Sequence, residues 1–385
     1  MLALAVVWTG LACGLEPTDR ARAFERELLG QAGRDKMFYV EQPDGPKLSL
    51  GGYMQFRYFD VVGGDQAPKD VTSGFTMQRT RLLISGTLPE QKIEFLILPS
   101  AGPNGQLSFF DAWTRWNISD EWSLTVGQFK LPLLREWLVA ERYLLAIERS
   151  VVNTTFCTIY SQGVQLEYRS QALHLMAAVS DGIRGFNTRY DAPGEADYAL
   201  TARVEALFDG SWAQFGDVTS LGNEQGGLMG GVALHHQGHT DTFAGVPIEA
   251  LTELTLDLSW EARRASLMAG GIARYLERDG GDDSVDYGVL VQGGVFVSDT
   301  LELFARGAMV IPDSDSSGDD PFPAITGGLT WYIAGHALRF KADAEWFPND
   351  LPDTVILNFG PDPGSGLLGP GGGQVALRAE FQLVF

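Results

Sequence analysis

An alternation of apolar and polar residues with a period of two runs from Lys47 to the C-terminus, and no other feature limits the possible folds as much. In the last segment every odd-numbered residue from 375 to 385 is apolar, whereas most even-numbered residues from 374 to 382 are polar or charged. Successive side chains of a β-strand point to opposite sides, so this period predicts strands with one apolar and one polar face. The pattern recurs in Leu48–Tyr58, Tyr198–Phe208 and Ala337–Trp346. The sequence therefore predicts an all-β protein.

The connections between the predicted strands alternate in length. The pattern places about 16 strands between Lys47 and Phe385, within the range of bacterial transmembrane barrels. The connections after odd-numbered strands are mostly long: Val61–Ser73, Leu131–Phe156, Asp181–Ala196, Gly238–Ile248, Glu277–Ser284, Pro312–Pro321 and Pro348–Gly373. Those after even-numbered strands are mostly tight: Pro89-Glu90, Ser119-Asp120, Ser170-Gln171, Arg263-Arg264, Ser298-Asp299 and Gly335-His336. Short periplasmic turns and long outer loops are typical of a transmembrane antiparallel β-barrel, whereas a soluble sandwich or propeller has no reason for this asymmetry.

One connection breaks the rule. Gly210–Gly226 follows an even-numbered strand and should be a tight turn, but it is long. Either the strand count is wrong at this point, or a further strand, Trp212–Thr219, lies within the connection.

Composition and charge exclude several classes of protein. No long uncharged apolar stretch follows the extreme N-terminus, which excludes a bundle of membrane-spanning helices. The net charge of −21 argues against binding of nucleic acid, because phosphate contacts require a basic face. Of the two cysteines, Cys13 lies in a predicted export segment, which leaves Cys157 without a disulfide partner.

The chain divides into three predicted segments. We expect residues 1–14 to be a signal peptide, because Leu2–Cys13 has the apolar character of one. The basic residues that normally precede such a segment are missing, so the start is expected to be truncated or misplaced, and lipidation at Cys13 is the less favoured alternative. We expect a periplasmic helical and linker segment over residues 15–46, and a barrel over residues 47–385.

Several stretches carry a resemblance to a known family. They are Lys47–Tyr58, Phe75–Leu88 (FTMQRTRLLISGTL), Asp111–Arg115, Thr125–Pro132 (TVGQFKLP), Glu141-Arg142 and Ile147–Ser150 (IERS), together with the terminal Phe385. They resemble the porin O/P family, the phosphate-selective porins, and the resemblance covers nearly everything after Lys47.

The resemblance implies a trimeric porin of about 16 strands in the outer membrane of a Gram-negative-type bacterium. Such a protein is not an enzyme and needs no cofactor. It forms a water-filled channel for passive diffusion of small hydrophilic solutes or ions, with anions such as phosphate among them. Its last strand, ending in Phe385, would be the signal that the barrel-assembly machinery reads, and its outer surface would contact outer-membrane lipids and lipopolysaccharide.

The resemblance also gives a role to the connection after the fifth strand, residues 132–156. Within it Leu133–Ser150 has a helical pattern, and in similar porins this loop folds into the barrel and narrows the pore. A wet, polar lumen can accept such backbone at membrane depth, and an external helix against the rim is the alternative. The charged residues expected to set the local field and the size limit of the pore are Arg135, Glu136, Glu141, Arg142, Glu148 and Arg149.

The polar face of the strands should line the lumen. The expected lumen-facing charged residues are Arg57, Arg79, Arg81, Asp111, Arg115, Arg169, Arg203, Glu205, Arg306, Arg339, Lys341, Arg378 and Glu380. Arginines attract anions, but neighbouring carboxylates can pair with them, so a cross-braced, hydrated wall is the favoured interpretation. The lysine cluster with which the family binds phosphate is not visible, and the prediction is therefore a general or weakly anion-selective porin.

Other functions and sites were weighed against this one. We expect no metal site, although His235 and His239 flank a turn and Asp313–Asp320 resembles the start of a calcium-binding loop. An outer-membrane barrel enzyme would need a nucleophile beside a base, and no Gly-x-Ser-x-Gly elbow is present. A soluble extracellular β-rich protein that binds carbohydrate is the remaining alternative.

Overall fold

A single antiparallel sheet contains every strand in the part of the chain that the structure describes. The computed structural model describes residues 38–41, 45–63, 71–88, 92–103, 105–157, 160–183, 187–190, 192, 196–238, 248–313, 320–352, 366–367, 369 and 371–385. The strands are β1 Phe38–Glu41, β2 Lys47–Val62, β3 Val71–Thr87, β4 Ile93–Ala101, β5 Leu107–Asn117, β6 Trp122–Lys130, β7 Tyr160–Arg169, β8 Leu173–Ser180, β9 Tyr198–Asp209, β10 Gly227–Gly238, β11 Ile248–Glu261, β12 Ala265–Arg278, β13 Ser284–Phe296, β14 Leu301–Ile311, β15 Phe322–Ala334, β16 Leu338–Phe347 and β17 Gln374–Val384. None of the helices in these residues is long and apolar enough to cross a membrane.

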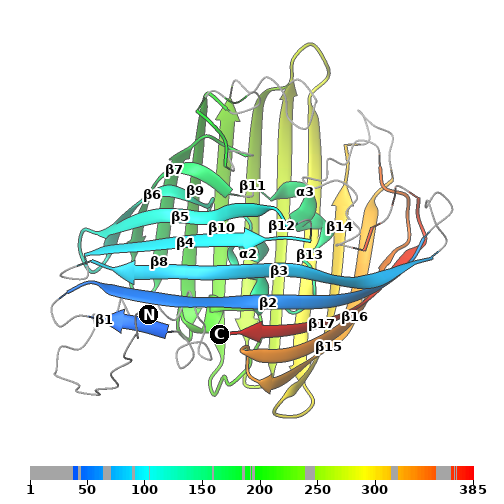
Figure 1. Cartoon of the computed structure of the whole chain (residues 1–385). Helices are drawn as coiled ribbons and strands as arrows, with labels where there is room; N and C mark the ends of the chain where they lie inside the picture. The colour runs from blue at the N-terminus through cyan, green and yellow to red at the C-terminus, as the bar shows by residue number, and fades with distance from the viewer. Residues whose placement is uncertain are drawn as a thin grey trace.

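The sheet closes on itself as a barrel of sixteen strands, β2–β17 (Figure 1). Each strand pairs antiparallel with its neighbours in sequence order, and β17 pairs with β2, with Phe381 opposite Phe56. At this seam the Phe385 N–H donates to the Gly52 carbonyl (2.9 Å) and the Gly52 N–H donates to the Phe385 carbonyl (2.7 Å). The predicted all-β transmembrane barrel is confirmed.

The short strand β1 continues the seam beyond the last residue. It pairs antiparallel with the start of β2, with Phe38 opposite Leu50 and Glu41 opposite Lys47. Part of the segment expected to be helix and linker is therefore a strand that extends the row of backbone hydrogen bonds past Phe385. The predicted signal peptide, residues 1–14, and the helical stretch at residues 16–35 lie outside the described residues.

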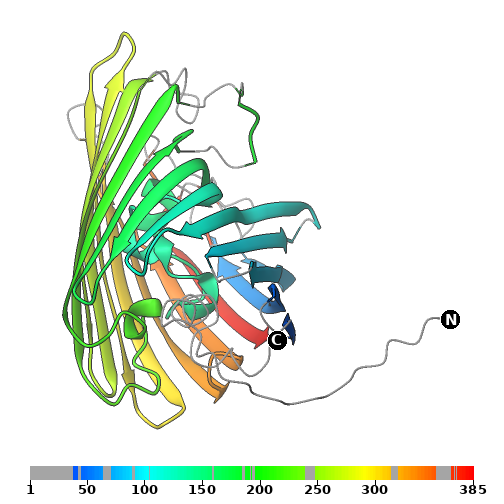
Figure 2. The same cartoon turned by 90° about the vertical axis from the view of Figure 1, so that its left-hand side faces the viewer.

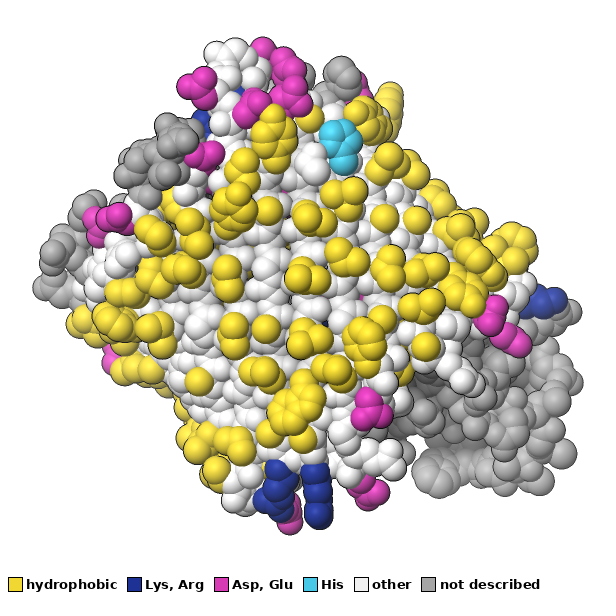
Figure 3. Space-filling view, turned by 180° about the vertical axis from the view of Figure 1, so that it is seen from behind, with side chains coloured by type: hydrophobic (Ala, Val, Ile, Leu, Met, Phe, Trp, Pro, Cys, Tyr) yellow, Lys and Arg dark blue, Asp and Glu magenta, His cyan; other side chains and the backbone are white. Residues whose placement is uncertain are grey.

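The two faces of the barrel wall are reversed relative to those of a soluble protein. Phe56 and Tyr58 point outward and are 44% and 38% exposed, whereas Arg57 between them is fully buried. Figure 3 shows apolar side chains spread over the back wall, with charged side chains gathered at its upper and lower edges. Lipid around the barrel and water inside it account for this arrangement. A soluble carbohydrate-binding protein would bury its apolar face instead, so the burial pattern argues against that alternative.

The wall is uneven in height. Strands β10 to β13 have 12 to 14 residues, whereas β4 to β8 have only 8 to 11. Figure 2 shows β10 to β13, coloured green to yellow, as part of a tall continuous wall along one side. Strands of about 9 residues still suffice to cross a bilayer, so the short side remains a membrane-spanning wall.

The long connection at residues 210–226 lies entirely within the described residues. It contains one short 3-10 turn, Gln214–Gly216, and no strand, so the predicted extra strand Trp212–Thr219 is wrong. Strands β9 and β10 pair directly with each other, from Asp209 opposite Leu228 onward, and the count of sixteen is unaffected. We name residues 210–226 the periplasmic segment.

Candidate functional site

The connection between β6 and β7 lies inside the barrel. Its residues 132–156, the constriction loop, form α2 (Arg135–Leu138), η2 (Glu141–Tyr143) and α3 (Val151–Phe156). Extended residues join these turns, so the helical pattern predicted over 133–150 is broken into pieces. The Ser150 side chain caps α3 by accepting a hydrogen bond from the backbone N–H of Asn153 (3.2 Å).

Hydrogen bonds from the wall hold the loop backbone across the lumen. Arg203 of β9 donates to the Leu133 carbonyl (2.9 Å), and Lys341 of β16 donates to the Leu144 carbonyl (2.6 Å). Strands β9 and β16 lie seven strands apart in a ring of sixteen, nearly opposite each other. The loop therefore spans the barrel, and the alternative of an external helix at the rim is wrong.

One face of the constriction loop packs against an apolar patch on the inner wall. The loop contributes Leu133, Val139, Tyr143, Leu144, Val152 and Phe156, and the wall contributes Met268, Ile272, Leu290, Phe304, Phe322 and Phe347. Wall residue Gly288 permits the close approach, because a Cβ there would lie 2.8 Å from Phe156 and Val152. Each large apolar side chain buried in this way contributes roughly 1.5–3 kcal/mol. The patch thus fixes the loop to strands β12–β16.

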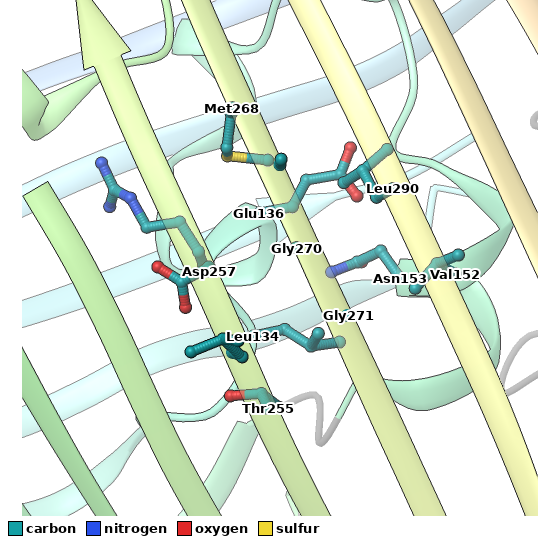
Figure 4. Close-up of a pocket in the computed structure, with 13 residues that line it drawn as sticks. Leu134, Glu136, Val152, Asn153, Thr255, Asp257, Met268, Gly270, Gly271 and Leu290 are labelled. Atoms are coloured by element: carbon teal, nitrogen blue, oxygen red, sulfur yellow. The ribbon is translucent and has the colours of Figure 1, made fainter.

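Little space remains between this face of the loop and the wall. Figure 4 shows the gap, where Glu136 and Asn153 of the loop face Met268 and Gly270 of β12. The gap measures about 20 Å³, which is room for about one water molecule. The constriction loop therefore lies close against the wall at this part of β12 and β13.

Glu141 ties the opposite face of the loop to β3. Its carboxylate lies 2.6 Å from Arg81 and 2.9 Å from Arg149. Burial alone would raise the pKa of Glu141, but Arg81 and Arg149 outweigh that effect and hold this pKa well below its usual range. Glu141 is therefore a fixed negative charge, and it is cancelled locally by its two arginines.

Two more carboxylates secure the loop. Glu148 bridges Arg79 of β3 (2.8 Å) and Arg57 of β2. Glu136 lies 3.4 Å from Arg306 of β14. Removing one partner from a buried pair of this kind typically costs about 3–5 kcal/mol, because the other charge stays buried and uncompensated.

The predicted charged residues lie on the inner side of the barrel wall or on the constriction loop. The loop residues Arg135, Glu136, Glu141, Arg142, Glu148 and Arg149 lie within the barrel, and the predicted lumen-facing residues of the strands point inward: Arg57, Arg79, Arg81, Asp111, Arg115, Arg169, Arg203, Glu205, Arg306, Arg339, Lys341, Arg378 and Glu380. Many of them pair across neighbouring strands, as Arg378 does with Asp343 (2.7 Å). Their part in permeation remains a prediction.

Some lumen charges have no partner of opposite sign. Among the described residues, the cations that lack a carboxylate within 4.0 Å include Lys130, Arg135, Arg142, Arg339 and Lys341. They contact carbonyls and rings instead; Lys130, for example, donates to the Trp137 carbonyl (2.7 Å). The described carboxylates that lack an Arg or Lys partner include Glu261 and Glu302 at the periplasmic end of the wall.

The open part of the lumen lies on the other side of the loop, against β5–β10. A cavity of about 260 Å³ runs there between the loop and the periplasmic segment. Its charged lining residues are Asp111, Arg115, Lys130, Arg135, Glu167, Arg169, His174 and Glu205, and its apolar ones include Trp113, Phe129, Leu138, Met176, Trp212, Phe215 and Met229. This cavity is open space that remains between the constriction loop and the periplasmic segment.

The periplasmic segment is a part of the site that sequence reasoning missed. Phe215 and Thr219 are buried beneath the barrel, where Arg135 donates to the Phe215 carbonyl and the Thr219 hydroxyl donates to Glu302 (2.9 Å). The only signal in the sequence was its length, on a side where the other turns are tight. The length indicated that this connection is irregular, but it did not indicate that the segment turns toward the lumen.

Of the candidate metal ligands, His235 lies within the described residues and makes other contacts. Within the described residues, no group of three or more His, Cys, Asp or Glu side chains is placed to hold a metal ion. His235 is buried and hydrogen-bonds Thr201 (2.8 Å) and Gln237 (3.1 Å). His239 and residues 314–319 of the acidic loop lie outside the described residues.

Comparisons with known proteins agree with this geometry. Residues 49–216 match the family model "Phosphate-selective porin O and P". No match was found among curated proteins. The fold is similar to that of OmpT of Vibrio cholerae (TM-score 0.61, 9% identity, covering 90% of this chain and 100% of that one). It is also similar to an anion-selective porin from Comamonas acidovorans (0.60, 13%, 88% and 100%) and to the outer membrane channel DcaP of Acinetobacter baumannii (0.60, 13%, 89% and 99%).

The family match covers strands that build one side of the barrel and the whole constriction loop. The structural likeness extends over the full barrel. Residues 49–216 match a porin family and the whole barrel has the fold of solved porins, and this chain is accordingly an outer-membrane porin of a Gram-negative-type bacterium.

Proposed function

We propose that this porin is a weakly anion-selective diffusion channel whose narrowest part is set by the constriction loop. The observation that carries the proposal is the group of lumen cations that have no carboxylate partner among the described residues: Lys130, Arg135, Arg142, Arg339 and Lys341. Positive charge that no neighbouring carboxylate cancels raises the local concentration of anions. The preference is weak because most other lumen charges are paired and because unpaired carboxylates lie at the periplasmic end.

Specificity for phosphate is not part of this proposal. The lysines of the described lumen are Lys130 and Lys341, and each donates to loop carbonyls: Lys130 to Trp137 and Lys341 to Leu144 and Ala146. A phosphate site needs several donors that are free to converge on one ion. The name of the matched family and the anion-selective relative describe those proteins, and for this chain they support an anion channel in general.

A planar-bilayer recording across a KCl gradient tests the proposal. We expect discrete conductance steps and a zero-current potential whose sign reports chloride passing more readily than potassium. Arg142→Gln should lower the chloride preference measurably, because it removes one unpaired cation from the lumen. Arg264→Gln is the matched control, since Arg264 is exposed on a periplasmic turn beside Asp299. A preference for potassium in the unchanged protein would contradict anion selectivity, and inserted protein without steps would contradict the channel.

The oligomeric state, the lipid contacts and the assembly signal of the barrel can be inferred as well. We infer a homotrimer embedded in outer-membrane lipid and lipopolysaccharide, with Phe385 as the residue that the assembly machinery reads. The V. cholerae relative is described in a trimer form, and the exposed apolar outer face of this barrel suits lipid contact. Removing Phe385 should reduce the amount of heat-modifiable barrel in the outer membrane, whereas undiminished assembly would contradict the signal role.

A further inference from the structure

The cavity of about 260 Å³ beside the constriction loop has a lining with two distinct characters. From it we infer a binding subsite for a small organic monoanion, a carboxylate attached to a compact apolar body. The inference rests on the proposed channel function and names a solute class for it. The cavity is slightly smaller than typical small-ligand pockets, which hold roughly 300–1,000 Å³. A single ring or a short branched chain is therefore the size that fits.

Arg135 supplies the anchor for the carboxylate. The Arg135 side chain lines the cavity and is only 8% exposed. Its guanidinium donates to the Phe215 carbonyl, but its Nε has no hydrogen-bond partner among the described residues, and no described carboxylate lies within 4.0 Å. A buried guanidinium with an unused donor is costly unless an acceptor is supplied. A carboxylate that enters the cavity can supply negative charge to this cation, and it binds the part of the guanidinium that remains exposed in a charge-assisted way.

Two of the carboxylates that line the cavity are paired with arginines. Glu205 lies 2.9 Å from Arg203, and Glu167 lies 3.1 Å from Arg115. His174 bridges the two carboxylates, at 3.3 Å from Glu167 and 3.2 Å from Glu205. These acids leave Arg135 free for a solute, and they repel a second negative charge at the same place. The subsite therefore favours a monoanion over a dianion.

The rest of the lining suits an apolar body. Leu138, Trp212, Phe215 and Met229 line the same cavity as Arg135. These side chains offer no hydrogen bonds to the water around a hydrated inorganic ion, and stripping that water is expensive. A ring or a short aliphatic chain gains instead from contact with them. The unpaired charge of Arg135 lies beside these apolar neighbours, with Lys130 as a second cation in the same lining, and this combination favours an organic carboxylate over phosphate.

Concentration-dependent reduction of the chloride current by added anion tests the inference in a planar bilayer. The probes are benzoate, inorganic phosphate at the same charge concentration, and benzyl alcohol, which has the ring without the carboxylate. We expect benzoate to reduce the current at concentrations at least about tenfold lower than phosphate does, and benzyl alcohol to have little effect. Arg135→Gln should weaken the benzoate effect by about tenfold or more.

Two further variants distinguish an effect of the charge itself from an effect of its position in the cavity. Arg142→Gln removes the same charge from the same loop outside the cavity, and it should change the benzoate concentration dependence by less than about twofold. Arg135→Lys keeps the charge if the glutamine variant fails to fold, and it should retain part of the benzoate effect. Phosphate acting as strongly as benzoate, or an unchanged benzoate effect in both Arg135 variants, would overturn the subsite while leaving the channel intact. Absence of any conductance would instead refute the proposed channel.

Discussion

Two connections of this barrel fold into the lumen from opposite ends, and they are held by different means. The constriction loop buries an apolar face against β12–β16 and adds ion pairs through Glu136, Glu141 and Glu148. The periplasmic segment contributes only Val218 to that apolar cluster, and its other attachments include single polar contacts such as Asp217 with His336 (3.2 Å) and Thr219 with Glu302 (2.9 Å).

The difference between these two sets of contacts indicates which of the two connections is held more rigidly. An apolar cluster and buried ion pairs together resist thermal displacement, whereas isolated polar contacts near the barrel end compete with water. We therefore expect the constriction loop to determine the pore size and the periplasmic segment to modulate it. The constriction loop and the periplasmic segment are joined by the hydrogen bond that Arg135 donates to the Phe215 carbonyl. A displacement of one of them should therefore shift the other.

Deleting residues 133–150 should have the largest effect. The deletion removes the barrier that spans the lumen from β9 to β16, so single-channel conductance should rise about severalfold, as pore area governs passive current. It removes Arg135, Arg142 and Arg149 together with Glu136, Glu141 and Glu148, so chloride preference should change much less than conductance. Bilayer recording measures both quantities. Because the deletion exposes Phe304 and Phe322 to the lumen, heat-modifiable gel mobility should be checked first, and unchanged conductance of a folded deletion would contradict the constriction role.

Replacing residues 211–225 by a tight turn should have a smaller effect. The periplasmic segment covers one end of the 260 Å³ cavity, so its loss should raise conductance by less than about twofold. The matched control is the same turn sequence placed at Ser298-Asp299, where the native turn is already short. An increase as large as that of the loop deletion would show that the periplasmic segment is the narrower of the two.

Acidification from pH 7 to about pH 4 should have the smallest effect. The pKa of Glu141 is held well below its ordinary range, so its ion pairs stabilise the loop above the ordinary carboxyl pKa and are lost only as the pH falls through the depressed value. Conductance and current noise should therefore stay nearly constant over this range. Glu141→Gln, which lacks the charge at every pH, should show more current noise already at pH 7. A sharp rise in noise between pH 5 and pH 4 in the unchanged protein would contradict this account of the loop.

Local patterns in the sequence predicted much of this architecture. Alternation fixes the face of each strand residue, so inward placement of Arg57, Arg203 and Arg378 followed from parity alone. The asymmetry of the connections predicted the barrel and its orientation. The resemblance to the porin family predicted that residues 132–156 turn inward, which parity could not have done.

Other features depended on the register of strands far apart in the chain. Arg57 pairs with Glu380 (2.6 Å) across the seam, and nothing local to either residue identifies the other. Inward Phe304 and Phe322 break the polar pattern of the lumen, and only the folded barrel shows that the constriction loop covers them. Likewise, only the folded barrel shows that the periplasmic segment turns toward the end of the lumen.

The sequence by itself determined the barrel, the approximate number of strands and the set of charges that face the lumen, because these depend on a two-residue period and on loop length. The tertiary structure alone decided which charges are cancelled, which side of the lumen the loop seals and where Arg135 remains free. Those outcomes depend on distances across the barrel, and such distances are fixed only when strand register and loop packing are set together.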